Sequence, residues 1–296
     1  MNQHTEEDGG YALSFEFFPA TTPEAQARFW RTVGCLETLS PAFFSMTCGA
    51  MGSTRDKSFD MLGQLALASD VPVAAHLTCG NRSTEAVRTD LAHLRAHGVN
   101  RLVALRGDLP ETATADAQDN VSVCRYASDL VELACAERWT DISVAAYPEV
   151  HPDAMNATAD LQALKYKLDA GGTRAITQFF YDPDVLLRFR DQMQSVGITQ
   201  PLVPGVLPIH DIEKVITFSQ RCGAEIPINL VDEFRVWADD SAASHELAVA
   251  QSLSLCETLK REGFDHFHFY TLNRSDLSYE VANLLVGEQS TGLAAA

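Results

Sequence analysis

The chain has no hydrophobic run long enough to cross a membrane, and residues 1–10 are polar and acidic rather than basic and then apolar. We therefore expect neither a membrane protein nor a secreted one, and we expect a cytoplasmic location. Basic residues are scarce, because 22 Lys and Arg stand against 40 Asp and Glu, for a formal net charge of −18. Such a chain repels phosphate backbones and anionic lipid surfaces, so binding to nucleic acid or to a membrane is not expected.

The 7 cysteines never form a Cys-x-x-Cys pair. Their odd number and scattered positions predict free thiols in a reducing compartment, rather than a disulfide framework or a zinc ribbon. Two nucleotide-binding motifs are also missing, since no Gly-x-Gly-x-x-Gly follows a strand and no Gly-x-x-x-x-Gly-Lys-Ser/Thr occurs. Any nucleotide must therefore be held by the loops of another fold, with individual cations or helix N-termini at its phosphates.

What the sequence does contain is a regular alternation of strand and helix patterns. Short apolar or aromatic runs predict eight strands, at residues 12–18, 42–46, 71–77, 101–105, 142–146, 174–179, 202–206 and 266–270. Helical periodicity lies between most of them, at residues 24–39, 84–97, 128–138, 160–170, 184–196 and 212–222. Eight such units in 296 residues predict one α/β domain, a single (β/α)8 TIM barrel spanning residues 1–296.

The alternation breaks before the last strand. Two helical patterns, over residues 227–237 and 244–262, stand between the seventh and eighth strands. We therefore predict extra helices inserted in the seventh βα connection. Residues 1–10 and 287–296 are expected to be flexible ends.

Glu16 lies where the first strand ends, and catalytic groups of such barrels lie at the carboxyl ends of the strands. Period-two alternation puts Ser14, Glu16 and Phe18 on one side and Phe15 and Phe17 on the other. Aromatic neighbours would desolvate the carboxylate and raise its pKa, which suits a general acid near neutral pH. A partly exposed structural carboxylate at a strand end is the alternative.

Two further strand ends carry groups suited to ligand binding. After the fourth strand, Gly107 lets the backbone approach a ligand, Arg106 can meet a phosphate or carbonyl, and Asp108 can accept from ring N–H groups. A solvated turn is the alternative interpretation of this segment. After the fifth strand, Tyr147 offers an aromatic face and His151 an imidazole.

A metal site is the competing hypothesis for the imidazoles. Glu149 and His151 follow the fifth strand, and His266 and His268 alternate on one face of the last. No His-Glu-x-x-His signature accompanies them, so we do not expect a metal.

Six segments resemble the bacterial methylenetetrahydrofolate reductases, namely FEFFP (15–19), AHLTC (75–79), LRGDLP (105–110), AAYPEVHP (145–152), ITQFF (176–180) and FHFYTLNR (267–274). They occur in the same order along almost the whole chain, which is far more specific than any one of them. The resemblance implies an FAD-containing barrel that takes hydride from NADH or NADPH. It would pass the hydride to 5,10-methylenetetrahydrofolate and form 5-methyltetrahydrofolate, with both half-reactions alternating at one flavin face.

The resemblance also implies roles for matching residues. Glu16 would be the general acid that protonates the folate N10, while Asp108 and Gln178 would hold the pterin and Asp108 would also tune the flavin. Phe218, Tyr270 and Arg274 would lie near the folate, with Arg274 at its glutamate tail. Residues that would line the FAD site are Thr47, Ala50, His76, Arg106, Gly107, Asp108, Tyr126, Ala127, Tyr147, His151, Ala154, Asp160 and Lys167. We expect small-molecule partners and a homo-oligomer.

Four positions depart from the family pattern. Cys48 replaces a tyrosine, Ala163 and Tyr166 replace polar residues of the FAD-binding helix, and Lys214 replaces a glutamine near the folate. A phosphate partner is therefore missing at position 166, and we expect the details of cofactor binding to differ. Two other hypotheses remain open, a folate- or pterin-binding barrel of another class and a non-catalytic subunit with the same fold.

Overall fold

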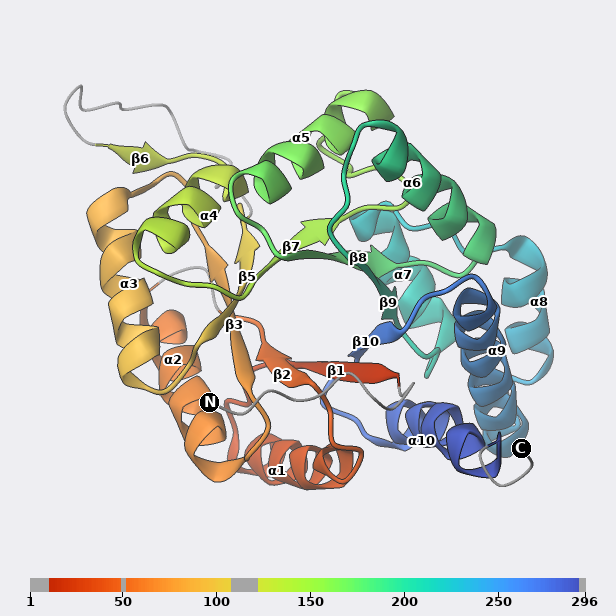
Figure 1. Ribbon diagram of the computed structural model, residues 1–296. Helices are drawn as coiled ribbons and strands as arrows, with labels where there is room; N and C mark the ends of the chain where they lie inside the picture. Colours follow the sequence, from red (N-terminus) through yellow and green to blue (C-terminus); the bar gives the residue numbers. More distant parts are fainter. Residues whose placement is uncertain (1–10, 49–51, 108–121, 293–296) are drawn as a thin grey trace.

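The computed structural model describes residues 11–48, 52–107 and 122–292, and its centre is a closed barrel of parallel strands (Figure 1). The strand order around the barrel is β1-β10-β9-β8-β7-β5-β3-β2. Their bounds are β1 Ala12–Phe17, β2 Phe43–Met46, β3 Val73–Thr78, β5 Arg101–Leu105, β7 Ile142–Ala146, β8 Arg174–Phe179, β9 Leu202–Val206 and β10 His266–Tyr270. The predicted (β/α)8 barrel and the predicted strands are confirmed.

Helices surround the barrel on all sides (Figure 1). In the described part of the chain they are α1 Pro23–Glu37, α2 Gly52–Ala68, α3 Thr84–Ala96, α4 Ala127–Ala136, α5 Ala157–Asp169, α6 Pro183–Ser195, α7 Ile212–Cys222, α8 Ile228–Val236, α9 Ser241–Arg261 and α10 Asp276–Gly292. The short strands β4 (Arg82–Ser83) and β6 (Val123–Cys124) pair antiparallel beside the barrel. Helices α8 and α9 are the predicted insertion before the last strand.

Local signals explain where several helices begin and end. The side chains of Thr22 and Ser83 cap α1 and α3 by accepting from backbone N–H groups three residues later. Gly223 follows α7 with φ of 71°, a left-handed conformation that glycine adopts without strain. Helix α10 continues to Gly292, so the backbone remains helical through the first part of the segment 287–296 that we expected to be flexible.

The core has two layers because side chains alternate along each strand. Phe15 and Phe17 are fully buried between the barrel and its helices, and Phe17 meets Phe29 of α1 edge to face. Ser14 and Glu16 point into the barrel, as predicted. The interior at the level of Ser14 is filled by an apolar cluster of Phe43, Ala74, Val103, Ile176 and Val203.

The cysteines and the helices bear on the expected free thiols and the expected lack of a membrane span. All 7 cysteines are unpaired, as predicted. Among the helices of the described segments, none is both long and apolar enough to span a bilayer.

Candidate active site

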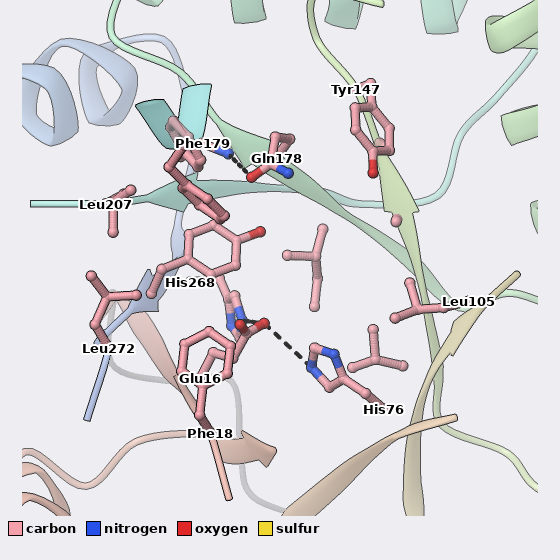
Figure 2. A pocket seen from close by; sticks show the side chains of 16 residues that line it. Glu16, Phe18, His76, Leu105, Tyr147, Gln178, Phe179, Leu207, His268 and Leu272 are labelled. Atoms are coloured by element: carbon pink, nitrogen blue, oxygen red, sulfur yellow. Dashed lines mark hydrogen bonds and ion pairs between the residues drawn. The ribbon is translucent and has the colours of Figure 1, made fainter. Parts of the chain in front are cut away.

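A cavity of about 220 Å³ opens at the carboxyl ends of the strands; we call it the mouth cavity (Figure 2). Glu16 of β1, His76 of β3, Gln178 of β8 and Tyr270 of β10 line it, and Tyr147 follows β7. These residues are far apart in the sequence. They meet because parallel strands of a barrel all end at the same face.

A longer groove of about 560 Å³ continues from the mouth cavity. Leu105, Ala145 and Tyr147 line both spaces, so the two are connected. The groove runs between the ends of β5 and β7 and the helices α4 and α5, and it ends among exposed tyrosines, Tyr126 and Tyr166. Together, the cavity and the groove form an elongated site.

Glu16 is the central acid of the mouth cavity, and only 8% of its surface is exposed. Its Oε2 atom lies 3.4 Å from Nε2 of His76 and 3.9 Å from Nε2 of His268. Burial raises the pKa of Glu16, and the nearby His76 opposes this shift to a smaller degree. Burial lowers the pKa of His76, while Glu16 opposes that shift. Both groups therefore favour their uncharged forms.

The surroundings of Glu16 differ in part from the predicted aromatic shell. Phe18 and Tyr270 do line the cavity, but the nearest polar partners of Glu16 are two imidazoles. His268 is fully buried, and burial lowers its pKa to about 3, so its ring is neutral. Alternation along β1 identified the face of Glu16 but could not reveal residues that β3 and β10 bring to that face.

Three predicted folate residues, Gln178, Phe218 and Tyr270, line the mouth cavity together. Oε1 of Gln178 accepts from the backbone N–H of Phe179, so its amide nitrogen is the group offered to a ligand (Figure 2). The hydroxyl of Tyr270 donates to the carbonyl of Thr177 at 2.6 Å. Phe218 of α7 stacks on Phe179 at the rim, with ring centroids 5.4 Å apart.

The groove carries cations at its floor. Nζ of Lys167 donates to the carbonyl of Ala145 at 2.6 Å, and burial lowers its pKa to about 8, although Asp160 opposes the shift. Arg106 forms an ion pair with Asp153. Ala127 is the first residue of α4, so a helix N-terminus, with its free N–H groups, also faces the groove.

The structure brings most of the predicted FAD residues into one place. Those that line the groove are Arg106, Gly107, Tyr126, Ala127, Tyr147, His151, Ala154, Asp160 and Lys167. His76 lines the mouth cavity instead. Thr47 follows β2, where its N–H donates to the carbonyl of Phe17, and it lines neither space. Ala50 and Asp108 lie outside the described residues.

Arg274, expected at the folate tail, follows β10. Its guanidinium is 2.7 Å from Asp276, and it lines neither the mouth cavity nor the groove. Of the residues that depart from the family pattern, Ala163 and Tyr166 line the groove. Lys214 is an exposed residue of α7 and pairs with Asp211.

The residues considered as metal ligands are engaged with other partners. Nε2 of His266 and Nδ1 of His268 lie 3.0 and 2.7 Å from Oγ of Ser14. Oε1 of Glu149 accepts from the backbone N–H of Glu225. Over the described segments, no group of three or more His, Cys, Asp or Glu side chains could hold a metal ion. His268 thus connects Ser14 with Glu16, a contact that the sequence did not reveal, although Ser14 shares the strand face of Glu16.

A closed parallel barrel with a buried acid in a cavity at its mouth and an elongated groove beside it is the architecture of a (β/α)8-barrel protein with its candidate site at the carboxyl ends of the strands. The profile of the family described as methylenetetrahydrofolate reductase matches residues 1–285. The 5,10-methylenetetrahydrofolate reductase of Escherichia coli (strain K12) is 38% identical over 286 residues, which cover 96% of this chain and 94% of that protein. The protein of the same name from Buchnera aphidicola subsp. Acyrthosiphon pisum is 37% identical over 96% of both chains. The chain therefore belongs to the methylenetetrahydrofolate reductase family and is an oxidoreductase.

A solved structure agrees with the fold. An uncharacterised protein from Clostridium thermocellum that binds two copies of 5-methyl-5,6,7,8-tetrahydrofolic acid superposes with a TM-score of 0.63. The alignment covers 95% of this chain and 96% of that one, at 14% identity. At that identity the likeness supports the barrel architecture alone.

Proposed function

We propose that this protein reduces 5,10-methylenetetrahydrofolate to 5-methyltetrahydrofolate with NADH or NADPH, through a bound FAD, and that Glu16 is its general acid. The observation that carries the proposal is the position of Glu16, buried beside uncharged imidazoles in the mouth cavity, which adjoins the groove. Membership of the family supports the substrate, because its relatives bear the name of this reaction. The free cysteines support a cytoplasmic location.

The groove fits FAD in size and chemistry. Its volume is about 560 Å³, within the range of roughly 300–1,000 Å³ that is usual for ligand sites. The groove also adjoins the mouth cavity. Lys167, Arg106 and the N-terminus of α4 would hold the phosphates, since charged donors and free N–H groups suit anions. When bound there, FAD supplies hydride transfer from the nicotinamide to the folate.

Glu16 performs the acid step. The overall reaction consumes one proton for each folate reduced, and the carboxyl of Glu16 delivers it to N10 so that the C–N10 bond can break. Burial keeps that proton on Glu16 at a pH where an exposed carboxyl has lost it. The amide nitrogen of Gln178 faces the same cavity and would orient the pterin, and we propose the same duty for Asp108.

Stopped-flow measurement of the two half-reactions of Glu16→Gln tests this assignment. We expect the flavin absorbance to bleach with NADH or NADPH at the rate of the parent enzyme. Its return on adding methylenetetrahydrofolate should slow by roughly 10²- to 10⁴-fold, the usual contribution of a general acid.

Glu149→Gln is the matched control, because Glu149 is a half-buried carboxyl that lines neither the mouth cavity nor the groove. It should leave both rates unchanged. The acid role would be refuted if Glu16→Gln slowed both half-reactions equally, or if it slowed neither of them. A purified protein that shows no flavin spectrum and binds no added FAD would refute the cofactor.

A further inference from the structure

A column of polar side chains runs through the barrel beneath Glu16. Ser14 and Glu16 alternate on the inward face of β1, and His266 and His268 alternate on the inward face of the neighbouring strand β10. Ser14 and His268 are fully buried, whereas His266, the first residue of β10, is partly exposed. The column therefore joins the mouth cavity to solvent at the amino ends of the strands, which we call the lower face.

Short contacts link the members of the column. Oγ of Ser14 lies 3.0 Å from Nε2 of His266 and 2.7 Å from Nδ1 of His268. The other nitrogen of His268, Nε2, is 3.9 Å from Oε2 of Glu16, and Figure 2 shows the two side chains close together. A shift of about 1 Å in the Glu16 side chain brings this pair within hydrogen-bond distance. A path of proton donors and acceptors thus extends from Glu16 to His266.

The rest of the barrel interior at this level is apolar, so the column is costly. Its neighbours are the side chains of Phe43, Ala74, Val103, Ile176 and Val203. A hydroxyl and an imidazole lose their hydration in such a place, and their mutual hydrogen bonds only partly compensate. Apolar side chains of similar size would fill the space at less cost. The polar column therefore indicates a function other than packing.

Both imidazoles of the column are in the state that suits proton transfer. Burial lowers the pKa of His266 and of His268 to about 3, so both rings are uncharged near neutral pH. At the lower face, Arg174 and Arg101 add to the shift of His266, and Asp141 opposes it. A neutral imidazole carries one N–H and one acceptor nitrogen, so it can take a proton on one nitrogen and give one from the other.

His76, the other imidazole beside Glu16, cannot form a path of this kind. Its Nε2 lies 3.3 Å from Oγ of Ser45 and 3.4 Å from Oε2 of Glu16. One nitrogen therefore faces both groups, so the ring does not bridge them as His268 bridges Ser14 and Glu16. Ser45 is also fully buried, and it offers no exit to solvent.

We propose that the column is a proton relay that reprotonates Glu16 from the lower face of the barrel while a ligand fills the mouth cavity. The inference rests on the proposed function, in which Glu16 gives its proton to N10 and becomes a carboxylate. Folate and nicotinamide occupy the mouth in turn, and each covers Glu16 from above. The relay restores the acid without waiting for the mouth to empty.

The transfer is a series of coupled hops. Nε2–H of His268 gives its proton to Oε2 of Glu16, while Nδ1 of the same ring takes the hydroxyl proton of Ser14. Oγ of Ser14 takes the proton from Nε2–H of His266, and Nδ1 of His266 takes one from solvent. Solvent loses one proton, Glu16 gains one, and each relay residue ends uncharged. Rotation of the hydroxyl and of the rings then resets the relay.

His266→Gln tests the relay, because an amide keeps a hydrogen bond to Ser14 but cannot pass a proton between two ring nitrogens. We compare flavin reoxidation by methylenetetrahydrofolate in a single turnover with the steady-state rate at saturating substrates. The single turnover should keep the parent rate, since Glu16 enters it protonated. The steady-state rate should fall roughly 10-fold, less than the 10²- to 10⁴-fold expected for loss of the acid itself, because Glu16 must then wait for an open mouth.

His245→Gln is the matched control, since His245 is a partly exposed histidine of the outer helix α9 that pairs with Glu280. Both of its rates should equal those of the parent. Imidazole added to His266→Ala should restore the steady-state rate, which it could not do if the loss were only structural. An unchanged steady-state rate in His266→Gln, or an equal loss in both measurements, would overturn the relay.

A measurement without turnover separates the relay from the proposed function. The infrared C=O band of the Glu16 carboxyl, identified by its loss in Glu16→Gln, should shift after transfer into D2O. We expect this shift to be several-fold slower in His266→Gln than in the parent. Equal rates of deuteration would overturn the relay. A protein that does not reduce methylenetetrahydrofolate fails the proposed function instead, and the comparison of deuteration rates still decides the relay.

Discussion

Nε2 of His76 lies 3.4 Å from Oε2 of Glu16, and burial shifts the pKa values of the two groups in opposite directions, each toward the uncharged form. A charged pair at this place would require two ions to be desolvated, which their attraction only partly offsets. An uncharged pair avoids that cost. Burial therefore favours a proton on Glu16 inside the mouth cavity.

The raised pKa of Glu16 predicts a specific dependence of stability on pH. The unfolded chain releases this proton near the ordinary value of 4.5, whereas the folded protein retains it to higher pH. The free energy of unfolding therefore falls as pH rises from 4.5 to the folded pKa. Glu16→Gln should be more stable than the parent at pH 7, and the difference should vanish below pH 4.5.

Urea unfolding at a series of pH values measures this difference. Glu132→Gln changes an exposed carboxylate of α4 and is the control. Its free energy of unfolding should not exceed that of the parent at pH 7. A Glu16→Gln variant that is less stable than the parent at pH 7 would contradict the prediction.

Ser14 joins two imidazoles inside the barrel, and its removal should be costly. Its single hydroxyl hydrogen can serve only one of His266 and His268, so it donates to one ring and accepts from the other. Ser14→Ala leaves both ring nitrogens without this partner. We expect a loss of about 1–3 kcal/mol in the free energy of unfolding, the usual cost of unsatisfied buried polar groups.

Ser278→Ala provides a matched comparison for this truncation. Ser278 is fully buried, and its hydroxyl has no hydrogen-bond partner in the described part of the structure. Its removal should leave stability unchanged or increase it slightly. Equal losses in the two variants would show that the hydrogen bonds of Ser14 do not stabilise the barrel.

Lys167 should determine much of the affinity for FAD. Lys167→Gln removes a cation from the floor of the groove, and we expect the Kd for FAD to rise roughly 10- to 100-fold, because hydrogen bonds to charged groups contribute about 1.5–3 kcal/mol. Quenching of flavin fluorescence on adding apoprotein measures the Kd. Lys165→Gln is the control, since Lys165 lies on the same helix, pairs with Asp169 and does not line the groove. Similar Kd values for the two variants would count against the groove as the FAD site.

Gly107 is constrained by the side chain of Thr78 as well as by its own left-handed backbone conformation. Its φ is +80°, and an added Cβ would lie 2.9 Å from Cβ of Thr78. Gly197 has nearly the same φ, +79°, but nothing lies within 4 Å of its added Cβ. Gly107→Ala should therefore lower the melting temperature more than Gly197→Ala, which measures the backbone strain alone. Thermal unfolding followed by circular dichroism measures both; an equal decrease would show that Thr78 yields without cost.

The sequence by itself determined the elements and their faces. The strands match their predicted positions because apolar runs and turn residues are local signals, and the alternation along residues 14–18 correctly placed Glu16 inside the barrel. The insertion before β10 was also visible, because two helical patterns interrupt a regular alternation. The family resemblance then named most of the residues that line the groove.

Only the tertiary structure decided which side chains meet. His76 and His268 come from different strands, 60 and 252 residues from Glu16 in the chain, and barrel closure brings both to its carboxyl. The contact of Phe218 with Phe179 depends equally on how helix α7 packs beside β8. Periodicity is a property of one element, whereas contacts between elements depend on the packing of the whole chain. Burial raises the pKa of Glu16 and its contact with His76 opposes that shift, so the balance between the two is decided only in the folded protein.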